Sequence, residues 1–527
     1  MHSGGPARLV TAARRGTAIS LGKSIRCLSR GLGRGGGTTL PGHVANRFDR
    51  GLLMSLARDL PNGCVLVTGT NGKTTTTRIL AEVARADGFH VITNPEGSNL
   101  LSGIATSLLI KAIAQGRLDV PPSAIGVFEV DEGALGPAIE ALDPRLVVIT
   151  NLFRDQLDRY FEVDFVAGLW QRSLRRLSSS ATVVLNADDA AVSFLGENLS
   201  AQVRHFGVDD VNHVNHQKCG KPGLEHAADS RRCPRCDHDL LYELNFYAHL
   251  GHYVCKECDW RRPDPEYAAQ NVLLHGAAGS TLEIRTAASD ERLLRIPLAG
   301  LYNAYNALAA AAGASCLGIS PSSLQAGVSE ITGAFGRLEP VRIGAKQAVL
   351  LLVKNPSGFT EALRLVLSLG PRARLIFGLN DNEPDGRDVS WIWDVDFEQC
   401  RERISYLAVA GTRARDLALR LKYAGIVTSR GRLTGCSDDT SDDTAQKHLL
   451  VDEDMTRSFF TAVEQAPAGT VVYVLSSYTA MWTLRRALVR RGFVAPFWRQ
   501  TSASPSAGHA PGAEPARQAG EELGRAR

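Results

Sequence analysis

The stretch that decides the fold is Val65-Leu66-Val67-Thr68-Gly69-Thr70-Asn71-Gly72-Lys73-Thr74-Thr75, which leads from an apolar run into a helix-like segment. The glycines let backbone N–H groups turn inward around an anion, and the N-terminus of the following helix adds partial positive charge. Lys73 is placed to reach the β- and γ-phosphates of a nucleotide, and the Thr74 hydroxyl is placed to hold Mg²⁺. The strict pattern has glycine where this chain has Val67. Because a strand precedes and a helix follows, a phosphate loop is favoured over a chance glycine turn.

Apolar runs and helix-like stretches alternate along the chain around this loop. The runs are Cys64–Thr68, Ile125–Val130, Leu146–Thr150 and Thr182–Leu185, and the helix-like stretches include 74–87 and 100–115. Such alternation predicts βαβ units, in which a parallel sheet carries helices on both faces. The runs are apolar throughout, which is typical of strands buried on both faces.

Polar residues follow two of these runs. Glu129, Asp131 and Glu132 close the second run, and Asn151 with the segment 155–158 follows the third. Ligands of open α/β sheets bind outside the C-terminal ends of strands, and Mg²⁺ prefers hard oxygen donors. We therefore expect a metal site here, with Glu129 and Asp131 on one face of a strand and Glu132 just beyond it. A solvated acidic loop is the alternative for each set alone.

Four cysteines, Cys233, Cys236, Cys255 and Cys258, form two C-x-x-C pairs separated by 18 residues. This spacing falls in the zinc-ribbon range, and four thiolates predict a closed, structural Zn²⁺ site. A disulfide or unliganded thiols are the alternatives. Cys219 and His226 lie nearby but outside the two pairs.

The composition is that of a soluble globular protein. The chain has 527 residues, 44% hydrophobic and 22% charged, and its net charge of +4 is too small to argue for nucleic-acid binding. No apolar run reaches the ~18 residues that a membrane span needs.

Composition and pattern divide the chain into five predicted segments. They are a basic N-terminal segment (1–48), a central ATP-binding domain (49–338) with an inserted zinc ribbon (219–262), a C-terminal α/β domain (339–500) and a disordered tail (501–527). The C-terminal strands are expected at Val349–Val353, Leu375–Leu379, Tyr406–Ala410 and Val471–Leu475. Residues 1–48 contain no Asp or Glu before Asp49. A helix packed on the first domain is favoured there over a transit peptide or a basic membrane-surface helix.

Several motifs together resemble those of Mur ligases and folylpolyglutamate synthases. The matching segments are the loop 69–75, Asn151 with Asp155-Gln156-Leu157-Asp158, Asn303-Ala304-Tyr305-Asn306, and Gly336-Arg337-Leu338-Glu339. The resemblance implies a P-loop central domain followed by a Rossmann-like α/β domain. It also implies that Glu129 is a metal-binding, catalytically required residue, that Asn306 contacts adenine, and that Asn303 and Arg337 belong to the nucleotide site.

Two departures from the common pattern point to one subfamily. Gln156 stands where these ligases have histidine, and Lys354-Asn355-Pro356 replaces their Asp-Tyr-Ala-His-Asn-Pro segment. Both departures, the cysteine pairs, and the segments 150–159, 379–382 and 385–394 are similar to MurT, the ligase-like subunit of lipid II isoglutaminyl synthases. The similarity covers about 40–498.

This resemblance implies a specific reaction. ATP would phosphorylate the α-carboxylate of D-glutamate in the lipid II stem peptide, and ammonia from a GatD-type class I glutamine amidotransferase would then form D-isoglutamine. Asp388 would complete a Cys-His-Asp triad with the partner's cysteine and histidine. We expect the protein to lie in the bacterial cytoplasm. Contact of the protein with the inner face of the membrane is a further hypothesis. A free-standing amino-acid ligase and a non-catalytic binder built around the zinc ribbon are the alternatives.

Overall fold

The computed structural model describes residues 5–31, 37–95, 97–154, 163–210, 228–286, 288, 290–331, 337–434 and 448–495, with side chains from residue 13 onward and without that of Arg337. Several predicted features lie outside the described residues. They are the segment 155–158, Cys219, His226, Gly336 and the tail 501–527.

The first sheet has nine strands among the described residues, in the order β11-β10-β9-β6-β5-β4-β1-β3-β2. Their bounds are β1 (Cys64–Thr68), β2 (His90–Ile92), β3 (Ala124–Glu129), β4 (Leu146–Ile149), β5 (Thr182–Asn186), β6 (Gln202–Val208), β9 (Tyr267–Leu274), β10 (Ser280–Arg285) and β11 (Glu291–Ile296). The pairs from β2 to β9 are parallel, whereas β9, β10 and β11 form an antiparallel meander. The parallel α/β prediction is confirmed, and the antiparallel meander at this edge was not predicted from the sequence.

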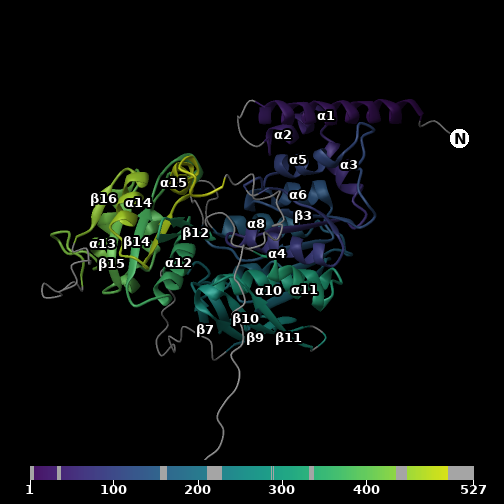
Figure 1. The fold of residues 1–527 in the computed structure, drawn as a ribbon. Helices are drawn as coiled ribbons and strands as arrows, with labels where there is room; N and C mark the ends of the chain where they lie inside the picture. The colour runs from purple at the N-terminus through teal and green to yellow at the C-terminus, as the bar shows by residue number, and fades with distance from the viewer. Residues whose placement is uncertain are drawn as a thin grey trace, which may run out of the picture.

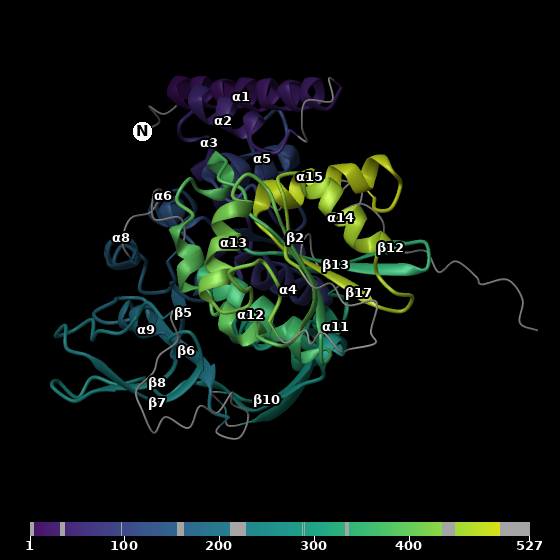
Figure 2. The same ribbon diagram turned by 90° about the vertical axis from the view of Figure 1, so that its left-hand side faces the viewer.

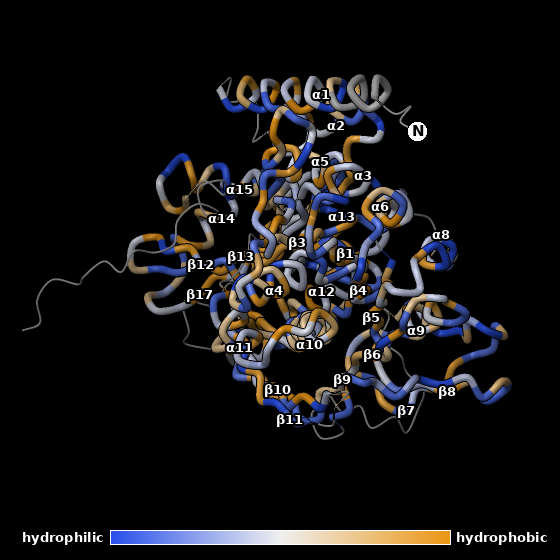
Figure 3. The backbone as a smooth tube through the Cα atoms, turned by 90° about the vertical axis from the view of Figure 1, so that its right-hand side faces the viewer, coloured by the Kyte–Doolittle hydropathy of each residue, from blue (hydrophilic) through white to orange (hydrophobic). Residues whose placement is uncertain are grey.

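Helices cover both faces of the first sheet. One face carries α4 (Lys73–Ala86), α10 (Leu301–Cys316) and α11 (Pro321–Ser329), and the other carries α3 (Leu52–Arg58), α5 (Leu101–Lys111), α6 (Leu135–Leu142) and α8 (Val163–Leu174). Val65 and Val67 face the first core, whereas Cys64 and Leu66 face the second. The strand runs are apolar throughout for this reason. Figure 3 shows hydrophobic, orange segments gathered around β1, β3 and α4.

The N-terminal helix α1 (Gly5–Gly31) lies across one end of the molecule, over α2 (Leu40–Phe48) and α5 (Figure 1). The guanidinium of Arg14 donates to the Phe48 carbonyl at the end of α2, with an Nη2–O distance of 2.8 Å. Lys23 Nζ donates to the carbonyl of Ala112, the C-cap of α5. Cations at helix C-termini are stabilising, so part of the basic charge of this segment serves packing on the first domain, as favoured from the sequence. None of the described helices is long and apolar enough to cross a membrane.

The second sheet has the order β12-β13-β17-β14-β15-β16 and is parallel except for β12. Its strands are β12 (Arg337–Ile343), β13 (Lys346–Leu352), β14 (Ala373–Gly378), β15 (Ile404–Ala410), β16 (Leu450–Asp452) and β17 (Val471–Ser476). Its helices are α12 (Pro356–Ser368), α13 (Ala414–Tyr423), α14 (Met455–Glu464) and α15 (Tyr478–Arg490). All four strands expected in this region are present. The domain boundary at 338/339 stays a prediction.

A two-stranded hairpin, β7 (Leu240–Tyr247) and β8 (Leu250–Cys255), stands apart from both sheets. Figure 2 shows it beside β5, β6 and the short helix α9 (Ala190–Phe194). Tyr253 of the hairpin donates to the Ala187 carbonyl and exchanges a hydrogen bond with Ser193. The hairpin is therefore bonded to the segment around α9.

Candidate active site

The loop between β1 and α4 has a conformation that requires its glycines. Gly69 has a φ of +135° and Gly72 a φ of +86°. A Cβ atom on Gly69 would lie 2.1 Å from the Thr150 hydroxyl oxygen, and one on Gly72 would lie 1.9 Å from Asn306 Oδ1. Backbone alone fits at both positions. The structure thus brings the loop and Asn306 of α10 together, although they are far apart in the sequence.

Asn71 at the tip of the loop is fixed by the segment that follows β4. Its N–H donates to Asn151 Oδ1 over 2.8 Å, and Asn151 Nδ2 donates back to the Asn71 carbonyl over 3.1 Å. The Thr150 hydroxyl donates to the same carbonyl over 2.7 Å. β1 and β4 are parallel neighbours, so the ends of both strands meet at one edge of the sheet, where ligands of such folds bind.

Lys73 is 6% exposed and points back into the loop. Its ammonium donates to the Gly69 carbonyl over 2.6 Å and forms an ion pair with Glu132 Oε1 at 2.7 Å. Glu132 is 4% exposed, and its own carbonyl accepts from the Trp170 indole N–H. The lysine charge is thus balanced by a buried carboxylate.

The three carboxylates after β3 have three different environments. Glu129 ends the strand and is 7% exposed. The Asn94 side chain donates to the Glu129 backbone carbonyl and accepts from the Glu129 backbone N–H. Asp131 lies beyond the strand and accepts from the N–H of Gly133, capping the short helix Glu132–Ala134. The expectation that Glu129 and Asp131 share a strand face is therefore wrong, because β3 ends at Glu129.

The remaining predicted nucleotide residues surround the same loop. Thr74 is half-buried at the start of α4, Thr75 is buried behind it, and Thr70 is buried with its hydroxyl on the Phe153 carbonyl. Asn303 Oδ1 accepts from Asn306 Nδ2 over 3.2 Å. Of Arg337, the structure describes the backbone in β12 only.

The C-terminal domain touches the loop directly. Asn355 Nδ2 donates to Asn71 Oδ1 over 2.8 Å, and Asn71 Nδ2 donates to the Ser357 hydroxyl over 3.0 Å. Asn355 also caps α12 by accepting from the N–H of Gly358. Asn355 and Ser357 of the second domain therefore hold the tip of the loop.

Asp388 lies in the second domain, in the segment between β14 and β15. It is half-buried, and its carboxylate accepts from the N–H of Ser390 at 2.8 Å and from the Ser390 hydroxyl at 2.9 Å. Its neighbour Asp385 is buried and accepts from Thr479 at the start of α15. Asp385 thus has a structural partner in another segment, whereas the hydrogen bonds described for Asp388 stay within its own turn.

The four predicted zinc ligands come together at the open end of the β7–β8 hairpin. The sulfur atoms of Cys233, Cys236, Cys255 and Cys258 all lie within 4.8 Å of one another. Cys233 and Cys258 are 3.6 Å apart and Cys236 and Cys255 are 3.4 Å apart, near the roughly 3.8 Å edge of a tetrahedral Zn–S₄ site. Burial raises the pKa of the Cys255 thiol, but hydrogen bonds from backbone N–H groups and neighbouring thiols outweigh it and bring this pKa to about 7. The donor set fits a structural zinc ion.

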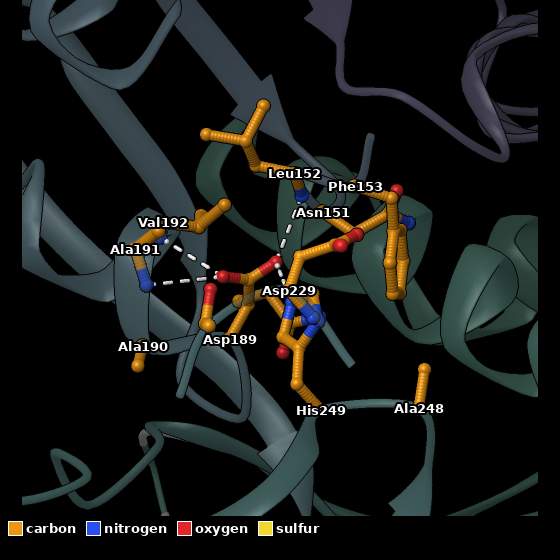
Figure 4. A network of polar contacts seen from close by, with 12 residues as sticks. Asn151, Leu152, Phe153, Asp189, Ala190, Ala191, Val192, Asp229, Ala248 and His249 are labelled. Atoms are coloured by element: carbon orange, nitrogen blue, oxygen red, sulfur yellow. Dashed lines mark hydrogen bonds and ion pairs between the residues drawn. The ribbon is translucent and has the colours of Figure 1, made fainter. Parts of the chain in front are cut away.

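Two features of the site were not predicted from the sequence. One is the pairing of Glu132 with Lys73, since three carboxylates follow β3 and only the fold separates their roles. The other is a buried network around Asp189 and His249, shown in Figure 4, which lies beside the segment that holds Asn71. The sequence carries no signal for that network, because its members come from segments that are far apart in the chain.

Comparison with known proteins first defines the class. A model of the Mur ligase middle domain matches residues 67–225, and a model of the MurT ligase C-terminal domain matches residues 352–481. A pseudomurein peptide ligase type C from Methanothermus fervidus superposes with a TM-score of 0.58 at 21% identity, covering 81% of this chain and 79% of that one. Folylpolyglutamate synthase from Mycobacterium tuberculosis, complexed with ADP and AMPPCP, gives 0.52 at 15% identity, with coverages of 83% and 95%. The fold is that of the Mur ligases.

Closer relatives then give the family. The MurT subunit of the glutamine-hydrolysing lipid II isoglutaminyl synthase of Streptococcus pneumoniae is 34% identical over 476 residues, which are 90% of this chain and 96% of that protein. The corresponding subunit of Staphylococcus aureus is 34% identical over 414 residues, or 78% and 89% of the two chains. This chain belongs to the MurT family.

Proposed function

We propose that this chain catalyses the ATP-dependent amidation of the α-carboxyl group of D-glutamate in the lipid II stem peptide. The product is D-isoglutamine, and a GatD-type glutaminase partner supplies the ammonia. The observation that carries the proposal is the arrangement of Lys73, Asn71 and Asn151 around a glycine loop, in a chain of the MurT family. The relatives' names describe a glutamine-hydrolysing lipid II isoglutaminyl synthase subunit.

The chemistry needs an activated carboxylate, because oxide is a poor leaving group. Transfer of the γ-phosphoryl group gives an acyl phosphate, from which ammonia displaces phosphate. Catalysis of this transfer is mostly positioning and neutralisation of charge. Backbone N–H groups of the loop 69–74, apart from those of Thr70 and Asn71 that donate to Asn151, would hold the phosphates of ATP. Lys73 would exchange Glu132 for a phosphate oxygen.

Two oxygen donors suit Mg²⁺, which neutralises phosphate charge when it is bound. They are the half-buried hydroxyl of Thr74 in the first turn of α4 and the carboxylate of Glu129 at the end of β3. Asn303, Asn306 and Arg337 would complete the nucleotide site. The four clustered cysteines would hold a structural Zn²⁺.

Asp388 would act with the partner rather than with ATP. A triad aspartate holds a histidine in the correct tautomer, and here the histidine and cysteine would belong to the glutaminase. Ammonia is a nucleophile only when unprotonated, and acyl phosphates hydrolyse readily. Both facts favour a closed path between the two subunits in the bacterial cytoplasm.

The test is co-expression with a GatD-type partner, followed by incubation with lipid II, ATP, Mg²⁺ and glutamine and mass analysis of the product. We expect the small mass decrease of a carboxyl group converted to a carboxamide, with one ADP formed per product. Addition of an intact amino acid instead would identify a free-standing ligase. No ATP turnover with salt-dependent binding of DNA or RNA would identify a binding protein.

A further inference from the structure

The turn of the β7–β8 hairpin is buried beside the candidate nucleotide site. It consists of Ala248, which has a φ of +49°, and His249, which is 0% exposed. The ring of His249 lies with its centroid 4.5 Å from that of Phe153, in the segment that follows β4 (Figure 4). The zinc ligands occupy the open end of the same hairpin, so the hairpin connects the cysteine cluster with the site.

The ring of His249 lies between two segments. The N–H of Asp229 donates to Nδ1 over 3.2 Å, and Nε2 lies 3.3 Å from Asp189 Oδ2. Asp189 is 0% exposed, caps α9 and accepts from the N–H of Leu152 over 2.8 Å.

The segment that Asp189 holds is the one that holds the phosphate loop. Within it, Asn151 binds the backbone of Asn71 on both sides. Phe153 N–H donates to the Thr70 hydroxyl over 2.9 Å, and that hydroxyl donates to the Phe153 carbonyl over 3.0 Å. Residues 151–153 therefore pack against the His249 ring and are hydrogen-bonded to Asp189 on one side, and they are hydrogen-bonded to the loop on the other.

Arg154 extends the same network to the second domain. Its N–H donates to Asp229 Oδ2 over 2.8 Å, and its guanidinium pairs with Asp229 and, at 3.3 Å, with Asp394 of the C-terminal domain. Asp229 lies only a few residues before Cys233, the first zinc ligand. One arginine thus joins the base of the cysteine cluster, the segment after β4 and the other domain.

We propose that the zinc-held hairpin is a working part of the ATP site, with His249 and Arg154 as positioning residues for the segment 151–154. The inference rests on the proposed function, since it assumes that the loop 69–75 binds ATP. The hairpin fixes His249, and His249 and Arg154 set Asn151 and Phe153 against the loop. Loss of either positioning residue leaves zinc in place but lets the loop relax from its binding conformation.

The experiment measures zinc content, unfolding temperature and ATP dissociation constant for the complex of the full chain with its glutaminase partner. The variants are His249→Gln, Arg154→Gln and Arg154→Lys. His252→Gln is the matched control, because His252 lies in the adjoining strand β8 and its Nε2 is within hydrogen-bonding distance of the Val208 carbonyl instead. The nucleotide probe is a non-hydrolysable ATP analogue with Mg²⁺.

We expect His249→Gln and Arg154→Gln to retain zinc yet bind the analogue about tenfold more weakly, the usual effect of breaking a buried polar network. Arg154→Lys should recover part of the affinity, and His252→Gln should bind as the unaltered chain does. Affinities within twofold of the unaltered chain for both Gln variants would overturn the inference alone. If His249→Gln loses zinc, Arg154→Gln decides, because the Arg154 side chain is 32% exposed and pairs with Asp229 and Asp394, which are not among the four cysteines. If the unaltered complex binds no ATP, both the proposed function and this inference are wrong.

Discussion

The phosphate loop and the Asp388 turn differ in how far this chain completes them. Both follow a strand of a parallel sheet, the loop after β1 and the turn after β14. Around the loop, Lys73 and Asn71 are buried or half-buried and bonded to residues of both domains. Asp388 is half-buried, and its described hydrogen bonds come from Ser390 alone. The loop is thus held by residues of both domains of this chain, whereas the role proposed for Asp388 requires groups from another subunit.

The largest effect should come from Lys73→Ala, which removes the cation of the phosphate loop. We expect ATP turnover to fall by about 10³–10⁵-fold with either glutamine or free ammonia, the range for a cation that contacts the transferred phosphoryl group. The change also leaves Glu132 buried without its partner, which costs about 3–5 kcal/mol. The double variant Lys73→Met/Glu132→Gln is the control. It should regain stability but not turnover, as measured by thermal unfolding and ADP release. Turnover in the double variant would contradict the role given to Lys73.

Asp388→Asn should affect glutamine-dependent amidation but not amidation with free ammonia. Glutamine-dependent amidation should drop by up to about 10⁴-fold, since the partner's histidine loses the group that orients it. Amidation with added ammonia should stay within about twofold, because the phosphate loop is untouched. Parallel rate measurements with both nitrogen donors provide the check. Asp381→Asn is the control, because Asp381 pairs with Arg413 in the same region. Equal loss with both donors would place Asp388 in the ATP site or in folding instead.

Removal of zinc should weaken ATP binding at the phosphate loop and leave partner binding near Asp388 unchanged. Cys258→Ser should abolish zinc binding and lower the free energy of unfolding by several kcal/mol, as for other structural zinc sites. Affinity for ATP should fall more than tenfold, because the hairpin would no longer hold His249 against the segment 151–154. Partner binding, followed by co-purification, should persist. Cys27→Ser is the control, because Cys27 is exposed on α1, away from the cluster. Full ATP affinity without zinc would contradict the coupling.

The smallest effect should come from Gly72→Ala, which tests how closely the loop is packed. Alanine would meet Asn306 Oδ1 and would also adopt a positive φ, so we expect ATP to bind about tenfold more weakly. Gly88→Ala is a matched control, because Gly88 has a φ of +91° with open space around it. The two variants should lose similar stability from backbone strain, about 1 kcal/mol, yet differ in nucleotide affinity. Equal affinities would mean that the contact with Asn306 is irrelevant to binding.

The sequence predicted those parts of the molecule in which one segment carries the whole signal. The loop 69–75 and the strands around it follow from glycine spacing and apolar runs, and the cysteine cluster follows from pair spacing. The antiparallel meander β9–β11 was missed, because strands that are exposed on one face interrupt the apolar runs with polar residues.

Parts of the site that depend on distant contacts could not be predicted. Glu132 was seen as one of three carboxylates, but only the path of the chain after β3 places it on Lys73. Asp189 and His249 belong to segments with no recognisable motif, and their meeting is set by how the hairpin packs on α9. The predicted roles of Glu129, Asn306 and Arg337 stay predictions, since each depends on a bound nucleotide or metal.

The central claim is that the phosphate loop activates a peptide carboxylate by phosphorylating it. The most direct measurement supplies lipid II with heavy oxygen in the D-glutamate α-carboxylate and follows the label by mass spectrometry during amidation. An acyl phosphate predicts that one heavy oxygen per product appears in the released inorganic phosphate. Amidated lipid II formed with ATP turnover but with unlabelled phosphate would contradict the account.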